Sequence, residues 1–211
     1  MTSITAPPCA LPQSEQENLI EKLEIFKIQG KDKRGCTILR IIGKNFPARV
    51  LNVEALKKYL EDVIFPSLRE TPFSMVYVNT GVSRSDNFPG ISALRSIYEA
   101  IPVKIRENLD SIYFLHPGFQ SRLFLATFGR LIFPGPGGWY WKVRYVNRLE
   151  FLWENVRRKD IEIPEYVYEE EEEMEYRPPT MDYGMESDHP RLYGSSILDC
   201  TVSTYSTRGI A

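Results

Sequence analysis

The chain has 211 residues, of which 43% are hydrophobic and 12% aromatic, and its 26 basic and 28 acidic side chains leave a net charge of -2. This length suits one domain plus a tail, and a domain of roughly 150 residues buries enough surface to fold without a disulfide or a metal. Three scattered cysteines include no Cys-x-x-Cys pair, which favours a reducing compartment over secretion.

Targeting and membrane-spanning signals are absent from the sequence. Residues 1–12 are expected to be a flexible leader, because they lack the basic start and apolar run of a signal peptide. No window approaches about 18 consecutive apolar residues, the length a membrane-spanning helix requires. We therefore expect a cytoplasmic protein. Residues 1–168 hold 23 basic and 18 acidic side chains, and this net +5 favours peripheral contact with an anionic membrane surface, although an ordinary solvated surface is the alternative.

The first predicted elements are a helix and a strand. Ser14 and Glu17 have the spacing of a capping box, and the apolar residues that follow recur on one helical face, which predicts a helix over residues 14–28. The run CTILRIIG, residues 36–43, is short, rich in β-branched residues and bounded by glycine. It predicts a buried strand.

A second helix–strand–helix unit follows. Asn52 can cap a helix that would end at Pro66. Residues 73–79 predict a second strand, and a polar loop separates it from a helix over residues 91–101. Pro102 interrupts that helix, and a short further helix resumes after it.

The centre of the chain repeats the alternation. We predict a third strand over residues 111–115, an apolar helix over residues 120–132, a Pro/Gly joint over residues 134–138, a fourth strand over residues 139–146, and a helix over residues 148–156. Strands that alternate with helices indicate an α/β fold, with a mostly parallel sheet flanked by helices.

The sequence changes in kind near its end. Residues 161–168 would add a last extended segment. Residues 169–211 begin with an acidic run that prolines interrupt, and they lack the apolar periodicity needed to offset the entropy of ordering. We therefore predict a disordered acidic tail over residues 169–211.

Residues 111–154 are the most informative stretch, because they hold all three tryptophans and 12 of the 26 aromatic residues. The helix over residues 120–132 is apolar around most of its circumference, with Arg122 and Arg130 as its only charges. Such a helix is either buried in the core or meets a membrane or an acyl chain. The adjoining Pro/Gly joint favours a movable lid over an apolar cavity. The predicted gate and cavity floor comprise Phe119, Leu123, Phe124, Phe128, Leu131, Ile132, Trp139, Trp141 and Val143, and the predicted hinge comprises Gly135, Gly137 and Gly138.

Catalytic constellations do not assemble from this sequence. Only two histidines exist, and His189 lies in the predicted tail. His116 follows a predicted strand, where it could contact a ligand or simply hydrogen-bond the loop. No Gly-x-Ser-x-Gly turn, phosphate-binding glycine loop or EF-hand spacing occurs. We therefore predict a protein that is not an enzyme and holds no metal or cofactor.

Nucleic-acid binding has one feature in its favour. The run WYWKVRYV interleaves aromatic residues with Lys142 and Arg144, as a base-stacking platform would. In a strand, however, Trp139, Trp141 and Val143 would share one apolar face. That face suits a core or a cavity, so we predict no nucleic-acid partner.

Two segments carry a family resemblance. They are residues 73–119, with VYVNTGVSRSDNFPG and the RENL run into IYFLHP, and residues 142–156, beginning KVRYVN. Both resemble the CRAL-TRIO lipid-binding domain. The likeness is greatest to its divergent branch, which includes the BCH domains and the C-terminal half of the ganglioside-induced differentiation-associated proteins. It covers roughly residues 13–168.

The resemblance implies a three-layer bowl with a cavity for one hydrophobic ligand, such as a phospholipid or phosphoinositide, and a gate formed by the helix over residues 120–132. It also implies an alternative, because BCH relatives scaffold small Rho-family GTPases and their regulators. In that case the loop over residues 83–89 or the acidic tail would bind the partner. The helical N-terminal lobe of larger members is reduced here to the helix over residues 14–28.

Overall fold

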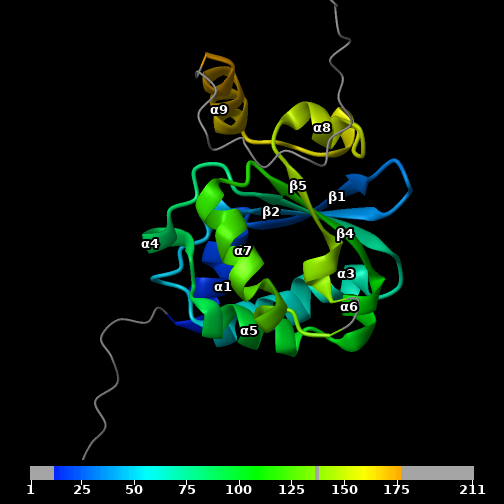
Figure 1. Ribbon diagram of the computed structural model, residues 1–211. Coiled ribbons are helices and arrows are strands. Elements are labelled where there is room, and N and C mark those ends of the chain that lie inside the picture. Colours follow the sequence, from blue (N-terminus) through cyan, green and yellow to red (C-terminus); the bar gives the residue numbers. More distant parts are fainter. Residues whose placement is uncertain (1–11, 136–137, 177–211) are drawn as a thin grey trace, which may run out of the picture. The chain divides into compact units, whose positions relative to one another are not determined.

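A computed structural model describes residues 12–135 and 138–176, which lie in one compact unit of the chain (Figure 1). The predicted leader up to residue 11, Gly137 of the predicted hinge, and residues 177–211 of the predicted tail lie outside the described residues. The unit is built on a five-stranded sheet with the order β1-β2-β3-β4-β5. β1 is antiparallel to β2, and every other neighbouring pair is parallel. The strands are β1 (Phe26–Lys31), β2 (Thr37–Ile42), β3 (Phe73–Val78), β4 (Leu109–Leu115) and β5 (Val143–Val146).

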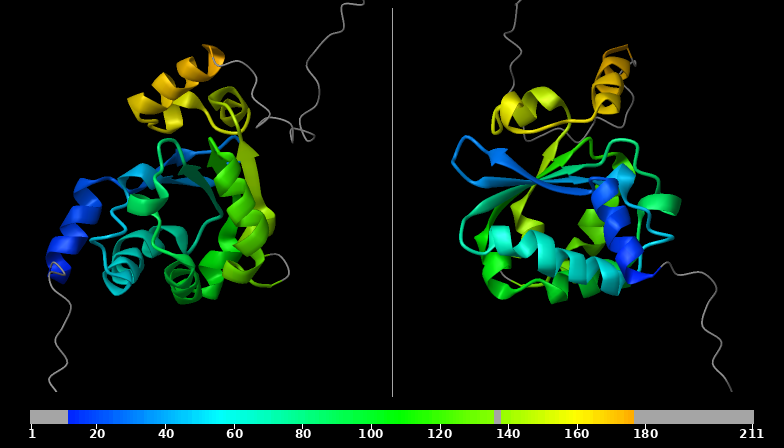
Figure 2. Two further views of the ribbon diagram at one scale, coloured as in Figure 1. Left: turned by 60° about the vertical axis from the view of Figure 1, so that its left-hand side comes forward. Right: turned by 180° about the vertical axis from the view of Figure 1, so that it is seen from behind.

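Helices cover both faces of this sheet, which confirms the predicted three-layer α/β architecture (Figure 2). The larger group packs on the face that we call the α5/α7 face. It comprises α1 (Gln13–Lys22), α2 (Val53–Tyr59), α3 (Phe65–Leu68), α5 (Ile91–Ala100), α6 (Val103–Asn108) and α7 (Phe119–Ile132). The opposite face, which we call the α8/α9 face, is covered by α8 (Leu149–Trp153) and α9 (Glu165–Tyr176). The short helix α4 (Arg84–Asn87) lies in the loop after β3.

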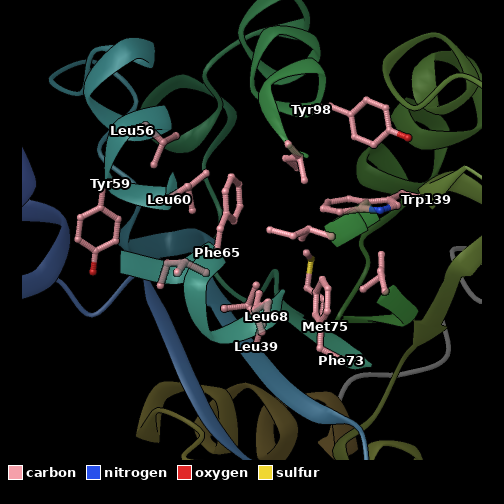
Figure 3. Packing of buried hydrophobic residues seen from close by; sticks show 14 of the residues in the cluster. Leu39, Leu56, Tyr59, Leu60, Phe65, Leu68, Phe73, Met75, Tyr98 and Trp139 are labelled. Atoms are coloured by element: carbon pink, nitrogen blue, oxygen red, sulfur yellow. The ribbon is translucent and has the colours of Figure 1, made fainter. Parts of the chain in front are cut away.

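Each face has its own apolar cluster. On the α5/α7 face, Leu56, Leu60 and Phe65 from the α2–α3 segment lie with Met75 and Trp139 in one cluster (Figure 3). On the α8/α9 face, strand residues pack against α8 and the start of α9. Burying large apolar side chains contributes roughly 1.5–3 kcal/mol each, so the two clusters hold the three layers together.

The helix predicted over residues 14–28 is too long. α1 ends at Lys22, Glu24 adopts a left-handed φ of 46°, and the chain then forms β1. Phe26 and Ile28 pack against the core while Lys27 faces away and binds Glu162, which is the period of a strand. The alternation is only a few residues long, so helical periodicity concealed it.

The two predicted helix caps have different outcomes. Asn52 caps α2, because its side chain accepts a hydrogen bond from the backbone N–H of Glu54 at 3.0 Å. α1 begins after Pro12 and has no side-chain cap. The capping box predicted from Ser14 is therefore wrong.

The fourth strand is half as long as predicted. Residues 139–142 form a 3-10 turn, and only Val143–Val146 pair with β4. Consequently Trp139 and Trp141 do not share a strand face: Trp139 is buried in the core, whereas Trp141 is 59% exposed. The indole N–H of Trp139 donates to the carbonyl of Arg106 at 3.3 Å and fixes the turn against α6.

The start of the predicted tail belongs to the folded unit. Residues 165–176 form α9, so the extended segment predicted over residues 161–168 is helical from Glu165, and disorder predicted from residue 169 is wrong as far as residue 176. The backbone N–H of Val167 bonds to the carbonyl of Pro164 at the start of the helix, and the Val167 side chain is fully buried. Acidic residues are also favourable in the first turn of a helix.

Candidate functional site

An aromatic row crosses the α5/α7 face of the sheet. Tyr77 of β3, Phe114 of β4 and Tyr145 of β5 lie side by side, with ring centroids 5.0 Å apart for the first pair and 6.2 Å for the second. Each of the three side chains is partly exposed. β3 and β4 are internal strands covered by helices, so partial exposure at these positions requires open space next to the rings.

The neighbouring positions on the same strands behave differently. Val76 and Val78 of β3, and Tyr113 and Leu115 of β4, point to the α8/α9 face and are completely buried. A close-packed interior leaves almost no room for a water-sized sphere. The open space therefore lies on the α5/α7 face, beside the aromatic row.

Tyr77 shows that this space is enclosed. Protein surrounds its ring, and burial raises the pKa of the phenol to about 12, yet part of the side chain remains accessible. A Cβ at Gly43 would lie 2.5 Å from the Tyr77 hydroxyl oxygen, so only glycine fits where the phenol ends. An enclosed but accessible side chain is typical of a residue that lines an internal pocket.

α7 is positioned by a close contact at its C-terminal end. A Cβ on Gly129 would clash with the ring of Tyr140. Glycine at this position therefore lets α7 approach the 139–142 turn more closely than a residue with a side chain would. Leu125 and Ile132 are the buried side chains of this helix besides Gly129. The predicted apolar gate therefore packs along one side only.

Phe124 and Phe128 of α7 are half-buried and in ring contact, with centroids 5.4 Å apart. The ring of Phe124 also meets Phe88, from the loop after α4, edge to face at 5.1 Å. These three side chains are partly exposed, like those of the aromatic row. Phe124 and Phe128 are the predicted gate residues that remain candidates for ligand contact.

The other predicted site residues are distributed differently. Ile132 and Trp139 are buried, and Val143 is half-buried against the core. Four predicted residues are each more than half exposed and lie on the outer side of the gate region instead of in a cavity floor: Phe119, Leu123, Leu131 and Trp141. At the joint, Gly135 has a φ of 107°, which favours glycine, and a Cβ at Gly138 would meet the carbonyl oxygen of Phe133 at 2.7 Å.

Tyr77, Phe114, Tyr145 and Phe88 were missed as candidate site residues. The signal for three of them is present in the sequence, because each occupies an alternate position of its strand next to a β-branched or aliphatic residue. Strand order is needed to place those three positions side by side, and the sequence does not reveal it.

Two surface grooves of about 500 Å³ each lie away from the aromatic row. One is bordered by Arg40, Glu162 and the end of α1, on the side of the α8/α9 face. The other lies beside the Pro/Gly joint and is bordered by Arg106 and Trp139. Their open, polar character suits them less to an apolar ligand than the enclosed rings of the aromatic row.

A polar cluster occupies the carboxyl ends of β3 and β4. The hydroxyl of Thr80 and Nδ1 of His116 are 2.8 Å apart, and Nε2 of His116 is 2.7 Å from Oε1 of Glu171 in α9. Burial by itself raises the pKa of the Glu171 carboxyl, but hydrogen bonds from His116 and the Leu149 N–H, together with nearby positive charge, hold it below its ordinary value. Hydroxyl, imidazole and carboxylate stand in the order of a catalytic triad. Thr80 is nevertheless buried, so its hydroxyl cannot reach a substrate. We therefore interpret these two hydrogen bonds as structural.

Metal and membrane-spanning features are absent from the part of the chain that the structure describes. Within residues 12–135 and 138–176, no cluster of three histidine, cysteine or carboxylate side chains could hold a metal ion. Over the same residues, no helix is long and apolar enough to cross a bilayer.

The fold and site together define a three-layer α/β domain whose sheet is closely packed on the α8/α9 face and has open space beside the aromatic row on the α5/α7 face. Residues 35–173 match the family described as a divergent CRAL/TRIO domain. The chain belongs to this family. The matched range includes α9 as far as Glu173, so the run of five glutamates, residues 169–173, lies inside the family domain.

Curated relatives place the chain near two kinds of protein. Ganglioside-induced differentiation-associated protein 2 of Xenopus tropicalis is 29% identical over 163 residues, which is 74% of this chain and 31% of that protein. Protein GDAP2 homolog of Drosophila melanogaster is 27% identical over 140 residues, 66% of this chain and 25% of that protein. Rho GTPase-activating protein gacY of Dictyostelium discoideum is 27% identical over 149 residues, 70% of this chain and 20% of that protein. The chain thus spans a third or less of these relatives.

Proposed function

We propose that this protein binds a hydrophobic ligand, such as a phospholipid or phosphoinositide, between the aromatic row of the sheet and α7, without catalysing a reaction. The observation that carries the proposal is the partial exposure of Tyr77 and Phe114 on internal strands under a helix. The family assignment supports it, because the resemblance implies a hydrophobic ligand. The proposal needs no cofactor besides the bound lipid.

The energy available from such a site is sufficient. Burial of an acyl chain contributes about 0.8 kcal/mol per methylene, so a palmitoyl chain supplies on the order of 10 kcal/mol before the costs of ordering. Aromatic rings present large rigid surfaces to such a chain. The Tyr77 phenol offers a polar contact at one end of the row.

An anionic membrane surface is the expected source of the ligand. Residues 111–148 contain five basic residues and no acidic one, in a chain with 28 acidic side chains. Phe119, Leu123 and Leu131 project from the outer side of α7, and the guanidinium of Arg130 lies over the exposed Trp141 ring at 4.9 Å. Exposed apolar groups among cationic ones are typical of surfaces that dock peripherally on anionic lipid.

The proposal is tested by native mass spectrometry of the protein purified from cells. We expect a co-purified lipid in the wild type and a clear loss of it in Phe114→Trp, because the larger ring fills the space beside the row. Val63→Trp is the matched control, since Val63 is 51% exposed on the segment between α2 and α3. Absence of lipid from every form, after incubation with mixed phospholipid vesicles as well, would contradict the proposal.

A second function is favoured by one comparison. A relative named as a Rho GTPase-activating protein matches 70% of this chain, so scaffolding of a small Rho-family GTPase is the alternative. The loop over residues 83–89 suits a contact surface because it is ordered: Asn87 bonds the carbonyls of Lys44 and Phe46 and accepts from the Ser83 N–H, leaving Arg84 exposed.

A pull-down with purified Rho-family GTPases in both nucleotide states separates the two functions. The scaffold function predicts capture that Arg84→Ala weakens and Phe114→Trp leaves unchanged. The lipid function predicts that Phe114→Trp loses the co-purified lipid and that Arg84→Ala retains it. No capture in either nucleotide state would remove the alternative.

A further inference from the structure

Three donors converge on the carboxylate of Glu171. Nε2 of His116 lies 2.7 Å from Oε1, the backbone N–H of Leu149 donates to the same oxygen at 2.5 Å, and Nη1 of Arg148 lies 3.5 Å from Oε2. Arg148 also donates to the backbone carbonyl of Glu171 at 3.0 Å. Charge-assisted donors that meet one carboxylate in this way form a strong and directional anion site.

The donors are held in place by residues outside α9. An ionised carboxylate only accepts hydrogen bonds, so Nε2 of His116 carries a proton and points it at Glu171. On the neutral ring the Thr80 hydroxyl then donates to Nδ1, which fixes that tautomer. His116 is 7% exposed, and its carbonyl accepts from the Asn79 side chain at 3.0 Å. Its left-handed φ of 50° is the kind of backbone strain that clusters at functional sites.

The apolar contacts of α9 are concentrated near its start, where Tyr166 also packs against the core and under Lys44. Val167, near its start, is the one buried residue of this helix, while Tyr168 and Tyr176 are exposed. Glu171 lies one helical turn beyond Val167 on the same face. Its carboxylate is therefore a polar anchor that holds the helix over the strand ends.

We propose that His116, Arg148 and the Leu149 N–H form a carboxylate-binding pocket, that Glu171 fills this pocket in cis, and that an acidic helical segment of a partner protein can replace it. The ligand class follows from the occupant that the structure contains, a glutamate on a helix within a run of five glutamates, residues 169–173. The pocket lies at the carboxyl ends of parallel strands, where open α/β sheets bind ligands.

The pocket is connected to the start of α7. Only Pro117 and Gly118 separate His116 from that helix. The hydroxyl of Ser121 lies 3.5 Å from Oδ1 of Asn79, whose amide holds His116, and Nε of Arg122 donates to the Pro117 carbonyl at 3.1 Å. Exchange of the occupant would therefore loosen the first turn of α7. If that loosening changes how lipid is loaded, this part of the inference rests on the proposed function. The carboxylate-binding pocket itself does not depend on lipid binding.

Hydrogen–deuterium exchange of the full-length chain tests the cis contact. We expect Glu171→Gln to lose protection over residues 165–176 and over residues 116–126, and Glu172→Gln, with the same charge change on the exposed side of α9, to retain both. Arg148→Gln is a second variant that removes a donor and leaves α9 intact. If all three match the wild type, Glu171 is no anchor and the proposal is overturned.

Fluorescence anisotropy with a labelled peptide of residues 165–176 tests the exchange in trans. We expect the full-length Glu171→Gln protein to bind it at least tenfold more tightly than the wild type or Glu172→Gln, because its pocket is vacated. The same peptide carrying Glu171→Gln should bind none of them. Equal binding by all proteins, or no binding by any, overturns the exchange, and neither readout depends on lipid.

Discussion

The two faces of this sheet are built from the same strands, but side chains near the carboxyl ends of β3 and β4 are buried on one face and partly exposed on the other. On the α8/α9 face, Val76 and Leu115 are completely buried against apolar residues of α8 and α9. The residues adjacent to them in the sequence, Tyr77 and Phe114, point to the other face and remain partly exposed beneath α7. The comparison indicates that the α8/α9 face is closely packed up to the carboxyl ends of the strands, whereas the α5/α7 face is packed beneath Leu39, Met75 and Ile112 and keeps open space only beside the aromatic row.

The α8/α9 face also carries the polar network that fixes the sheet edge. The Asp32 carboxylate is buried and accepts from the N–H groups of Arg34 and Cys36 at 2.9 Å and from the Ser74 hydroxyl at 2.7 Å. Arg34 in turn donates to Ser111 on β4. Fully satisfied buried networks of this kind make a core rigid and specific.

The largest expected effect is at the centre of the α8/α9 face. Leu115→Ala removes a fully buried side chain and leaves a cavity, so we expect the free energy of unfolding to fall by about 3 kcal/mol. Urea denaturation monitored by circular dichroism measures it. A loss below about 1 kcal/mol would show that this face collapses easily, and the contrast between the faces would disappear.

The next effect concerns the bond between α9 and this face. Glu171→Gln removes the charge that three donors meet, and we expect a loss of about 2 kcal/mol at neutral pH, since hydrogen bonds to charged groups contribute about that much. Glu172→Gln should change the free energy of unfolding by less than about 0.5 kcal/mol, as surface substitutions usually do.

The pH dependence of this loss has a defined sign. The pKa of Glu171 is lowered in the folded state from its ordinary 4.5, so its contribution is complete above that value and disappears as the pH falls through the lower folded pKa. The difference in unfolding free energy between wild type and Glu171→Gln should therefore narrow only below pH 4.5. A difference that narrows already between neutral pH and 4.5 would assign the effect to another group.

These outcomes also show what the sequence can and cannot predict. Periodicity located most elements between β2 and α8, because long apolar patterns and Pro/Gly boundaries are local signals. β1 was missed because its alternation is short. α9 was missed because contacts far apart in the sequence hold its helix, among them the burial of Val167 and the hydrogen bond that His116 donates to Glu171. The apolar helix was found, but its outward residues were assigned to the cavity, since composition does not reveal which side of a helix faces inward.

A smaller effect is expected beside the aromatic row on the α5/α7 face. Phe114→Trp enlarges a side chain that borders open space, so we expect less than about 1 kcal/mol of destabilisation, whereas overpacking a filled core costs about 1–3 kcal/mol. Val76→Phe on the α8/α9 face is the matched comparison and should fall in that range or above it. Equal losses of unfolding free energy for the two substitutions would mean that the aromatic row is packed as tightly as the opposite face. A ligand would then have no space beside the row.

The smallest effect on stability is expected on the outer side of α7. Leu123 is 55% exposed, so Leu123→Ser should change the free energy of unfolding by less than about 0.5 kcal/mol. Its effect should appear instead in co-sedimentation with vesicles that contain phosphatidylserine, because the side chain no longer enters the lipid interface. Val63 on the segment between α2 and α3 is similarly exposed, so Val63→Ser should sediment like the wild type. If both variants sediment like the wild type, the exposed apolar side chains of α7 do not contact the membrane. The lipid must then enter the space beside the aromatic row by a route that does not involve the outer side of α7.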